Sequence, residues 1–300
     1  MKVWIAHEQG RTLTGPLPAA AQVEVYDGSQ PPSDPATVEV WVPPFLANAA
    51  AMLDTMPAVR LVQLLSAGAD AWVARVPGHV TLCDARGVHD SSTAEWTVAA
   101  ILAYLRNFPA FARAQASREW AYSPTDELAG KRVLIVGAGS IGTAVARRLE
   151  PFDVSVTLVA RRAREGVYGV DDLPVLLPQA DVAVLIVPLT PETTGLVDAA
   201  FLAALPDGAL LVNAARGPVV DTAALTAELA SGRIGAAVDV TDPEPLPPDH
   251  PLWTMPNFLL TPHVAGSVLG LLPRAYRLVG AQLRRYAAGV PVANVVVDGY

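Results

Sequence analysis

The sequence of 300 residues contains a single cysteine, Cys83. A lone cysteine excludes an internal disulfide and a thiolate metal cluster, so we expect Cys83 to be a small core residue in a reducing compartment. No apolar run approaches the roughly 18 residues that a membrane-spanning helix needs. The first residues, MKVWIAHEQG, lack the long apolar stretch and the cleavage site of a signal peptide, and we therefore expect a cytoplasmic protein.

Charged residues are scarce too, and their balance is acidic. Only 17% of the residues are charged and the net charge is −8, whereas proteins that bind nucleic acid display clustered positive charge. Apolar residues make up 52% of the chain, which excludes an intrinsically disordered protein. We expect a globular protein with neither nucleic acid nor a membrane as its partner.

Two common kinds of hydrolytic site lack their signatures. The chain contains no G-x-S-x-G elbow of the kind that presents a nucleophilic serine. Its histidines, at positions 7, 79, 89, 250 and 263, show no spacing typical of metal ligands. We predict no metal site.

Short apolar runs, which occur throughout the chain, indicate the fold. From residue 131 onward they alternate with helix-like segments such as SIGTAVARRLEPF, and they read RVLIVG, VSVTLVA, DVAVLIVP, GALLVN, GAAVDV and NFLLTPH. Nearly continuous runs of this kind are typical of parallel strands that are buried on both faces. The first 90 residues repeat the pattern in KVWIAHE, QVEVYDG, TVEVWVPP, RLVQLLSAG and VTLCDARG. The sequence therefore predicts an α/β protein with two doubly wound open sheets.

The order of these segments predicts how the two sheets share the chain. A helical pattern runs over 91–117, and we expect one long helix there with Ser91 or Ser92 as its cap. The chain becomes helical again after residue 267, so that it could return to the first sheet. We predict a Rossmann cofactor domain at 91–267, inserted into a flavodoxin-like substrate domain formed by 1–90 and 268–300, with a cleft between them.

One turn between a strand and a helix has the pattern of a dinucleotide site. The segment VLIVGAGSIG places Gly137, Gly139 and Gly142 as G-x-G-x-x-G directly after an apolar strand. Such glycines permit a tight turn, a close approach of backbone to a pyrophosphate, and close packing of helix on strand. An ordinary strand-to-helix turn is the alternative, but the flanking strand and helix favour a cofactor site that includes Ser140 and Ile141.

The end of the next strand indicates which dinucleotide binds. This fold presents an acid there to the ribose 2′-hydroxyl of NAD, or an arginine to the 2′-phosphate of NADP. Here the strand ends in Arg161, with Arg162 and Arg164 close behind it. A guanidinium binds a phosphate through two parallel hydrogen bonds, whereas a carboxylate would repel it. We predict NADP(H), with NAD(H) as the second choice, and assign the contact to Arg161 and Arg162. A solvated basic loop is the alternative for Arg164 and also for Arg162.

Three later segments each place a charged or titratable residue after a predicted strand. They are LLVNAARGPVVD (210–221), GAAVDVTDPEPL (235–246) and LLTPHVAGS (259–267), which contain Arg216, Glu244 and His263. Open α/β sheets bind ligands at the carboxyl ends of their strands. Taken singly, each residue has a structural alternative: an arginine in a surface ion pair, a loop glutamate, and a histidine bonded to backbone.

Together these segments resemble the D-2-hydroxyacid dehydrogenase family, and most closely its glyoxylate/hydroxypyruvate reductase branch. The resemblance extends from LLSAGAD to TPHVAG and includes GAGSIG, PLTPETTGLVD, NAARGPVVD, DVTDPEPLP and HPLW. It implies a nicotinamide-dependent reductase of small 2-oxo acids such as glyoxylate or hydroxypyruvate, with Arg216, Glu244 and His263 as catalytic residues. It also implies a homodimer built on the cofactor domains.

The chemistry of such a reduction suits these three residues. It needs a cation for the substrate carboxylate, a hydride donor, and an acid that protonates the carbonyl oxygen as charge develops there. Arg216 can hold the carboxylate and polarise the carbonyl. His263 can deliver the proton, and Glu244 beside it would stabilise the imidazolium. Two flanking prolines stiffen the loop around Glu244. Closure of the two domains would exclude water from the site before hydride transfer.

The resemblance implies further contacts. Backbone amides around Ala67 and Gly68 would bind the substrate carboxylate from the first domain, although a plain turn explains that segment too. Asp239 would face the nicotinamide carboxamide. The remaining residues implied to contact the cofactor are Pro188, Thr193, Ala214, Ala215, Arg216, His263 and Gly266.

Four bulky residues are left with open roles. Trp96 stands where many relatives carry a smaller residue or histidine. Phe45 and Leu46 would form an apolar wall near the substrate, or pack in the core. Trp120 would reach the site of a partner subunit, as an aromatic residue does in some similar reductases, or pack in a dimer or the core.

Two other functions stay open at this point. A dinucleotide-sensing binding protein that resembles this family could keep the same three residues with little catalysis, and turnover would distinguish the two. Oxidation of formate or phosphite is the other, but a formate dehydrogenase would be expected to carry glutamine where Glu244 stands.

Overall fold

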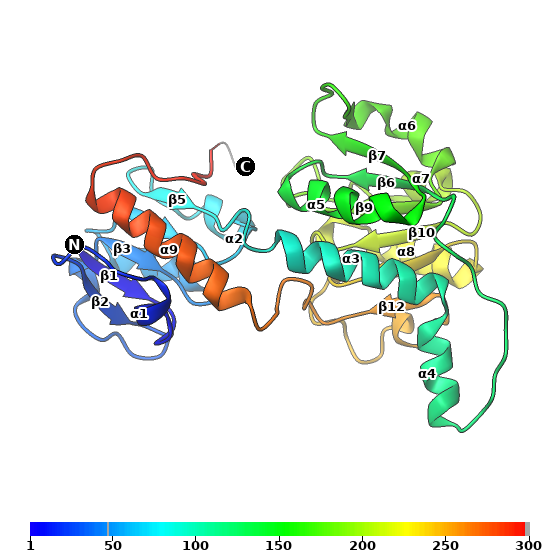
Figure 1. Ribbon diagram of the computed structural model, residues 1–300, viewed down its shortest axis with the longest axis horizontal. Coiled ribbons are helices and arrows are strands. Elements are labelled where there is room, and N and C mark those ends of the chain that lie inside the picture. The colour runs from blue at the N-terminus through cyan, green and yellow to red at the C-terminus, as the bar shows by residue number, and fades with distance from the viewer. Residues whose placement is uncertain (47, 298–300) are drawn as a thin grey trace. The chain divides into compact units, whose positions relative to one another are not determined.

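Residues 1–46 and 48–297 are described by a computed structural model, in which the chain divides into two units (Figure 1). Unit 1 comprises Met1–His89 and Val268–Tyr300, and unit 2 comprises Asp90–Ser267. Residues 298–300, with which the predicted substrate domain ends, lie outside the described residues. Among the described residues, no helix is long and apolar enough to cross a membrane.

Unit 2 is built on a parallel sheet with the strand order β12-β11-β10-β9-β6-β7-β8. The earliest strand, β6, lies inside the sheet, and the chain proceeds from it first to one side and then to the other, as in dinucleotide-binding folds. The predicted runs are its strands, to which the structure adds the two-residue β8. The strands are β6 (Arg132–Val136), β7 (Ser155–Ala160), β8 (Tyr168–Gly169), β9 (Val182–Leu185), β10 (Leu210–Asn213), β11 (Gly235–Val238) and β12 (Phe258–Leu260).

Both faces of this sheet are buried, which is why its strands read as continuous apolar runs. Along β6, Val133 and Ile135 enter one hydrophobic core while Leu134 and Val136 enter the other. The first core is covered by α3 (Asp90–Leu105) and α5 (Ser140–Leu149), and the second by α6 (Leu173–Leu176), α7 (Ala199–Ala204) and α8 (Thr222–Ser231).

The prediction of one long helix over 91–117 is wrong. Helix α3 ends at Leu105, and α4 (Phe108–Ala116) begins after Asn107, whose φ of 54° lies in the left-handed region. Pro109 explains the break, because a proline has no amide hydrogen and its ring clashes with the preceding turn, whereas the first turn of a new helix tolerates it.

The predicted cap is wrong as well. Helix α3 already begins at Asp90, so that Ser91 and Ser92 lie inside its first turn. The Ser91 hydroxyl instead donates a hydrogen bond to Glu95 at 2.9 Å and accepts one from Arg148 of α5 at 2.8 Å. These side-chain bonds help to fasten α3 to α5.

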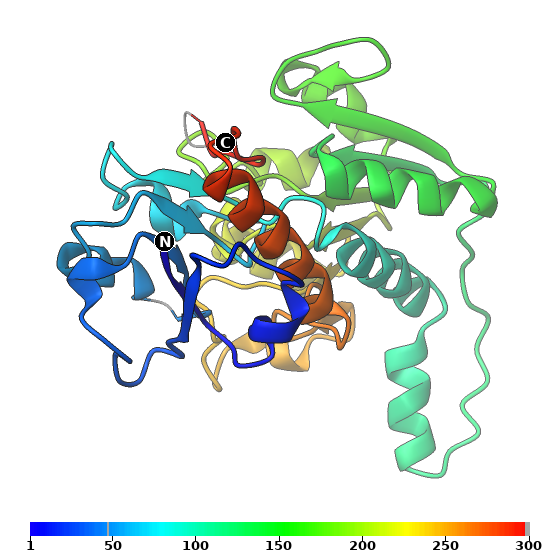
Figure 2. The same cartoon turned by 60° about the vertical axis from the view of Figure 1, so that its left-hand side comes forward.

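An arm extends from unit 2. Figures 1 and 2 show α4 and the returning segment 117–127 leading away from the sheet of unit 2 in both views. Two aromatic side chains on the returning segment are almost fully accessible, Trp120 at 97% and Tyr122 at 87%. Core packing within the chain therefore does not explain Trp120.

Unit 1 has a parallel sheet with the order β2-β1-β3-β4-β5, which is typical of flavodoxin-like folds. Helix α9 packs on one face through Tyr276 and Val279, and α2 packs on the other through Trp72. The two sheets confirm the predicted fold class. The elements of unit 1 are β1 (Lys2–Ile5), α1 (Gly10–Leu13), β2 (Gln22–Val25), β3 (Val40–Val42), β4 (Leu61–Gln63), α2 (Asp70–Val73), β5 (Thr81–Cys83) and α9 (Leu271–Ala287).

A buried amide pair joins the last part of the chain to the sheet of unit 1. Gln282 of α9 donates to the Gln63 Oε1 at 2.9 Å and to the carbonyl of Ala293, and its own oxygen accepts from the Ala293 amide. Buried amides need such partners, and here they connect α9, β4 and the C-terminal segment. Short 3-10 helices complete both units: η1 (Pro35–Thr37), η2 (Ala49–Thr55), η3 (Glu150–Phe152), η4 (Val170–Asp172), η5 (Leu177–Gln179), η6 (Gly217–Val219) and η7 (Pro251–Thr254).

Candidate functional site

The glycine loop between β6 and α5 has the geometry of a phosphate cradle. A Cβ atom on Gly137, whose φ is 120°, would lie 2.4 Å from the Ile186 carbonyl oxygen, and one on Gly142 would lie 1.9 Å from the Gly137 oxygen. A Cβ on Gly139 would meet nothing within 4 Å, and Gly139 directly precedes Ser140 at the start of α5. Two glycines thus serve close packing, while the third leaves the helix N-terminus open to an anion.

The predicted cofactor residues Ser140 and Ile141 form the first helical residues after this loop. The Ser140 hydroxyl donates a hydrogen bond to Asp90 Oδ1 at 3.0 Å, which joins the start of α5 to the start of α3. The first amides of a helix have no partner within it, so the backbone of this turn fits a pyrophosphate.

Three arginines follow β7, and one of them contacts the glycine loop. Arg161, Arg162 and Arg164 are all exposed, and Arg164 donates from Nη2 to the Ala138 carbonyl at 2.9 Å. The guanidinium of Arg164 therefore lies against the glycine loop while the side chain stays exposed to solvent, so the solvated-loop interpretation stays open for it. Arg164 is a candidate anion contact that the sequence interpretation did not assign.

Arg161 lies near the loop that follows β9. A hydrogen bond from Thr190 lowers the pKa of Glu192, and the positive charge of Arg161 contributes to this shift to a smaller extent. In the same loop Thr193 donates to the Pro188 carbonyl at 2.6 Å and accepts from the Thr190 amide at 2.8 Å. The structure thus joins two predicted cofactor contacts, Pro188 and Thr193, in one turn beside β6.

The loop after β10 is shaped by a buried side chain that the sequence interpretation missed. Asn213 is 1% exposed, accepts a hydrogen bond from the Ala215 amide at 3.0 Å, and donates to the Arg216 carbonyl at 3.1 Å. Arg216 in turn donates from Nη1 to the Ala215 carbonyl at 2.7 Å. Asn213 therefore sets the course of the segment that contains Ala214, Ala215 and Arg216.

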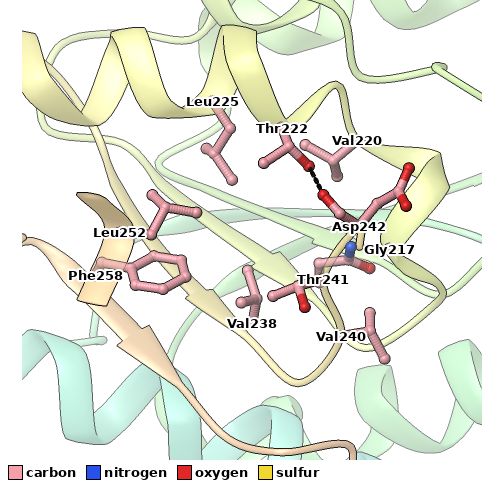
Figure 3. A pocket seen from close by; sticks show the side chains of 11 residues that line it. Gly217, Val220, Thr222, Leu225, Val238, Val240, Thr241, Asp242, Leu252 and Phe258 are labelled. Carbon is pink, nitrogen blue, oxygen red and sulfur yellow. Dashed lines mark hydrogen bonds between the residues drawn. The ribbon is translucent and has the colours of Figure 1, made fainter. Parts of the chain in front are cut away.

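The loops after β10 and β11 touch each other, as Figure 3 shows. A Cβ on Gly217 would lie 1.9 Å from the Thr241 carbonyl oxygen, and Thr222 donates a hydrogen bond to the Asp242 carbonyl at 2.7 Å. A cavity of about 20 Å³ lies among these residues, which is room for one water and too little for a substrate. These contacts hold the segments of Arg216 and Glu244 at the same edge of the sheet.

Glu244 and His263 form a direct pair. The His263 Nδ1 lies 2.7 Å from the Glu244 Oε1, and both side chains are about half exposed, at 46% and 43%. An ionised carboxylate only accepts hydrogen bonds, so Nδ1 is the donor and Nε2 faces away from the pair. The structure therefore brings two of the three predicted catalytic residues together, with one ring nitrogen left to exchange a proton.

Asp239 forms hydrogen bonds with the histidine loop, which is the segment 261–267 that contains His263. It is 2% exposed, and its carboxylate accepts hydrogen bonds from the Thr261 hydroxyl and from the amides of Val264 and Ala265. Gly266 follows in the same loop. The contacts of Asp239 and Gly266 with a nicotinamide cofactor stay predictions.

In unit 1, the expected carboxylate-binding segment follows β4. The Ser66 hydroxyl donates to the Gly68 carbonyl at 2.7 Å, and Ala67 and Gly68 are partly exposed. Their role toward a substrate stays a prediction. Phe45 and Leu46, beyond the end of β3, are 53% and 52% exposed, so core packing does not account for them.

The part of the chain that the structure describes contains no cluster of metal-ligating side chains. Within residues 1–46 and 48–297, no group of three or more His, Cys, Asp or Glu residues could hold a metal ion. The one cysteine, Cys83, is fully buried, and burial raises the pKa of its thiol to about 12.

Known proteins share both the sequence and the architecture. Residues 98–265 match the sequence profile of the NAD binding domain of D-isomer specific 2-hydroxyacid dehydrogenases. A glyoxylate reductase of Thermofilum pendens is 35% identical over 257 residues, which cover 78% of this chain and 74% of that protein. A D-isomer specific 2-hydroxyacid dehydrogenase from Xanthobacter autotrophicus Py2, solved in complex with NADPH and MES, is 35% identical with a TM-score of 0.84 over 100% of both chains. The NADPH-dependent glyoxylate/hydroxypyruvate reductase from Sinorhizobium meliloti, solved with NADP and sulfate, is 28% identical with a TM-score of 0.86 over 100% of this chain and 99% of that one.

Proposed function

The chain belongs to the D-isomer specific 2-hydroxyacid dehydrogenase family, a family of oxidoreductases, and we propose that it is an NADP(H)-dependent reductase of small 2-oxo acids. Its substrates would be glyoxylate, hydroxypyruvate or a similar acid, and its products D-2-hydroxy acids. The observation that carries the proposal is the 2.7 Å contact between His263 and Glu244 in the unit that also holds the glycine loop. The matching sequence profile and the similar reductases confirm the expected resemblance to this family, whereas the substrate is our proposal.

The preference for NADP(H) is supported by charge. Arg161, Arg162 and Arg164 follow β7, where this fold meets the adenosine ribose, and Arg164 already contacts the glycine loop. The relatives from X. autotrophicus and S. meliloti were solved with NADPH and NADP. When bound, the nicotinamide supplies the hydride that reduces the carbonyl carbon.

The side chains of unit 2 divide the remaining work. Glu244 accepts a hydrogen bond from the Nδ1–H of His263, which fixes the ring orientation and stabilises the imidazolium, so that Nε2 can protonate the carbonyl oxygen. Arg216 would hold the substrate carboxylate and polarise the carbonyl. A neutral imidazole remains after the proton has moved, and water can recharge it because the pair is half exposed.

We also propose a homodimer that forms through unit 2. The arm presents Trp120 and Tyr122 to solvent, together with Phe108 at 59% exposure. Exposed aromatic side chains on one projecting element are typical of a surface that another subunit covers. Sedimentation analysis should find a dimer, and Trp120→Asp should raise its dissociation constant, whereas a monomeric wild type would refute the proposal.

Initial rates test the proposed function directly. NADPH and NADH should be oxidised in the presence of glyoxylate, hydroxypyruvate, pyruvate and phenylpyruvate, and we expect rapid turnover of at least one acid with NADPH. His263→Ala should lower kcat by two or more orders of magnitude, because it removes the proton donor, while NADPH still binds. Arg216→Ala should raise KM and lower kcat together.

Two outcomes would favour the alternatives. Tight NADPH binding without turnover of any acid would support a dinucleotide-sensing protein. Reduction of cofactor by formate, with no activity on 2-oxo acids, would support a formate dehydrogenase despite Glu244.

A further inference from the structure

The loop that carries His263 adopts a backbone conformation that its sequence does not favour. His263 has a φ of 54°, in the left-handed region that residues other than glycine seldom enter, because it brings the Cβ atom close to the backbone. Such a conformation persists only where surrounding contacts hold it. The ring of His263 points toward Glu244 from this strained position, so the contacts that hold the backbone also aim the ring.

Asp239 makes those contacts with three successive amides. Its backbone carbonyl accepts from the His263 amide at 2.7 Å, its Oδ1 from the Val264 amide at 2.8 Å, and its Oδ2 from the Ala265 amide at 2.7 Å. One buried residue thus determines the course of the whole turn. The position of the carboxylate, in turn, must be set by something else.

A hydroxyl and an indole orient the carboxylate. Thr261 donates from Oγ1 to the Asp239 Oδ1 at 2.5 Å, and the Trp96 Nε1 donates to that same Oγ1 at 3.0 Å. A threonine hydroxyl has one proton, and an indole nitrogen can only donate. Because the indole supplies one bond, the Thr261 proton is directed to Asp239.

The indole itself is firmly anchored. Trp96 belongs to α3, and its ring packs against the core that α3 and α5 share. Helix α3 is the first helix of unit 2, and Trp96 stands 165 residues before Thr261 in the sequence. The hydrogen bond therefore connects the histidine loop to helix α3 and to the core that α3 shares with α5.

We propose that Trp96 is a positioning residue for His263, acting through Thr261 and Asp239. The inference rests on the proposed function, because it assigns Trp96 to the alignment of the proposed proton donor. A phenyl ring at position 96 would keep an aromatic contact with the core, yet without an N–H it would leave the Thr261 hydroxyl free to rotate away from Asp239. The loop would then sample orientations in which His263 no longer meets the substrate.

Trp96→Phe and Thr261→Val test the chain of bonds, because each removes one link; valine keeps nearly the shape of threonine, and phenylalanine keeps an aromatic ring of smaller volume at position 96. Each should lower kcat about tenfold, in keeping with one misplaced hydrogen-bonded group, while the dissociation constant of NADPH stays within about twofold of wild type. The double variant should be no slower than Thr261→Val alone, since both changes break one chain. Thr261→Ser keeps the hydroxyl and should restore kcat.

A second measurement reads the loop without catalysis. Amide hydrogen exchange over residues 261–267 should be at least about fivefold faster in Trp96→Phe and Thr261→Val than in wild type. Trp4→Phe is the matched control, because it removes an indole bond of 2.8 Å to Glu24 in unit 1. It should leave both kcat and exchange in 261–267 unchanged.

Each contrary result has a definite meaning. Wild-type kcat in Trp96→Phe, unchanged exchange in 261–267, or additive losses in the double variant would each overturn the proposal. An equal loss in Trp4→Phe would do so too, because it would trace the effect to general stability. If wild type reduces none of the acids, the proposed function fails, and the exchange comparison alone decides whether Trp96 holds the loop.

Discussion

Replacing Arg161 by aspartate inverts the charge directly after β7, and we expect the cofactor preference to move from NADPH toward NADH. The two cofactors differ only in the 2′-phosphate, which this position meets in a dinucleotide-binding fold. Arg161 is exposed, and its charge already acts on Glu192 in the neighbouring loop. The variant therefore changes the electrostatics of the site without disturbing a packed side chain.

The size of the effect follows from two contributions. A hydrogen bond between charged groups contributes about 1.5–3 kcal/mol, and the lower figure of about 1.5 kcal/mol suits an exposed arginine. The new carboxylate adds a repulsion of similar size toward a phosphate. Their sum of about 3 kcal/mol corresponds to a loss of about 100-fold in kcat/KM with NADPH, whereas NADH should change by less than about threefold.

Initial rates with both cofactors, at a saturating concentration of the best 2-oxo acid, measure this change. Arg147→Asp, in the last turn of α5, alters the net charge equally at an exposed position and serves as the matched control. The loss with NADPH should shrink at 0.5 M salt, because screening at that ionic strength weakens exposed charge interactions. Equal losses with NADPH and NADH, or equal effects of Arg161→Asp and Arg147→Asp, would refute the assignment of the 2′-phosphate to this end of β7.

Three further variants and conditions test other parts of the structure. Gly142→Ala should lower the temperature midpoint of unfolding by several degrees, since its Cβ would lie 1.9 Å from a carbonyl oxygen. Gly139→Ala should keep that midpoint and weaken NADPH binding about tenfold or more. A reversed pattern in thermal scans and binding titrations would contradict the phosphate cradle. Because burial raises the pKa of Cys83 to about 12, a thiol reagent at pH 8 should modify the native protein far more slowly than the urea-unfolded chain, and equal rates would exclude the buried position. The hydrogen bond from Arg132 lowers the pKa of Asp181 in the folded protein. The pair therefore stabilises the fold at pH values above the unfolded pKa of about 4, by less than about 1 kcal/mol at this surface site. This stabilisation is lost as the pH falls through the lower pKa of the folded protein. Asp181→Asn should therefore unfold at lower urea than wild type at pH 7 and at the same urea in strong acid, and a constant difference would disprove the linkage.

The strands of unit 2 could be predicted because both faces of the sheet are covered. Each central strand then contributes apolar side chains to two cores, and the run becomes continuous, as in LLVN of β10. The edge strand β8 could not be found in this way. It has two residues, of which Tyr168 is 51% exposed, and so it leaves no apolar run.

The sequence contains a signal for the break between α3 and α4, but a helical periodicity that spans the break favoured one helix. Apolar residues recur with helical spacing on both sides of Asn107, and this periodicity suggested a single helix. Pro109 marks the start of a new helix, because the proline ring clashes with the carbonyl of residue 105 if α3 continues. A local backbone constraint therefore overrides a periodic pattern that spans it.

The site residues that could be predicted from the sequence are those that directly follow strands. The pair of Glu244 and His263 follows β11 and β12, which are neighbours in the sheet, so adjacency of the strands brings the two residues together. The roles of Asn213 and Arg164 depend on the exact path of a loop and on side-chain direction. The hydrogen bond between Trp96 and Thr261 depends on how a helix lies on the sheet, which no local pattern encodes.

Asp239 shows that a charged residue at the end of a strand can be required by the fold rather than by a ligand. Its two carboxylate oxygens accept from one hydroxyl and two amides, which are all donors. Asparagine has a single acceptor oxygen, so its amide group would face the amide of Val264 or Ala265 with donor against donor. Only an aspartate can satisfy the turn that holds His263 in its left-handed conformation. The demand for an acid at position 239 thus arises within the fold, and the geometry of the histidine loop accounts for it without any contact to the nicotinamide.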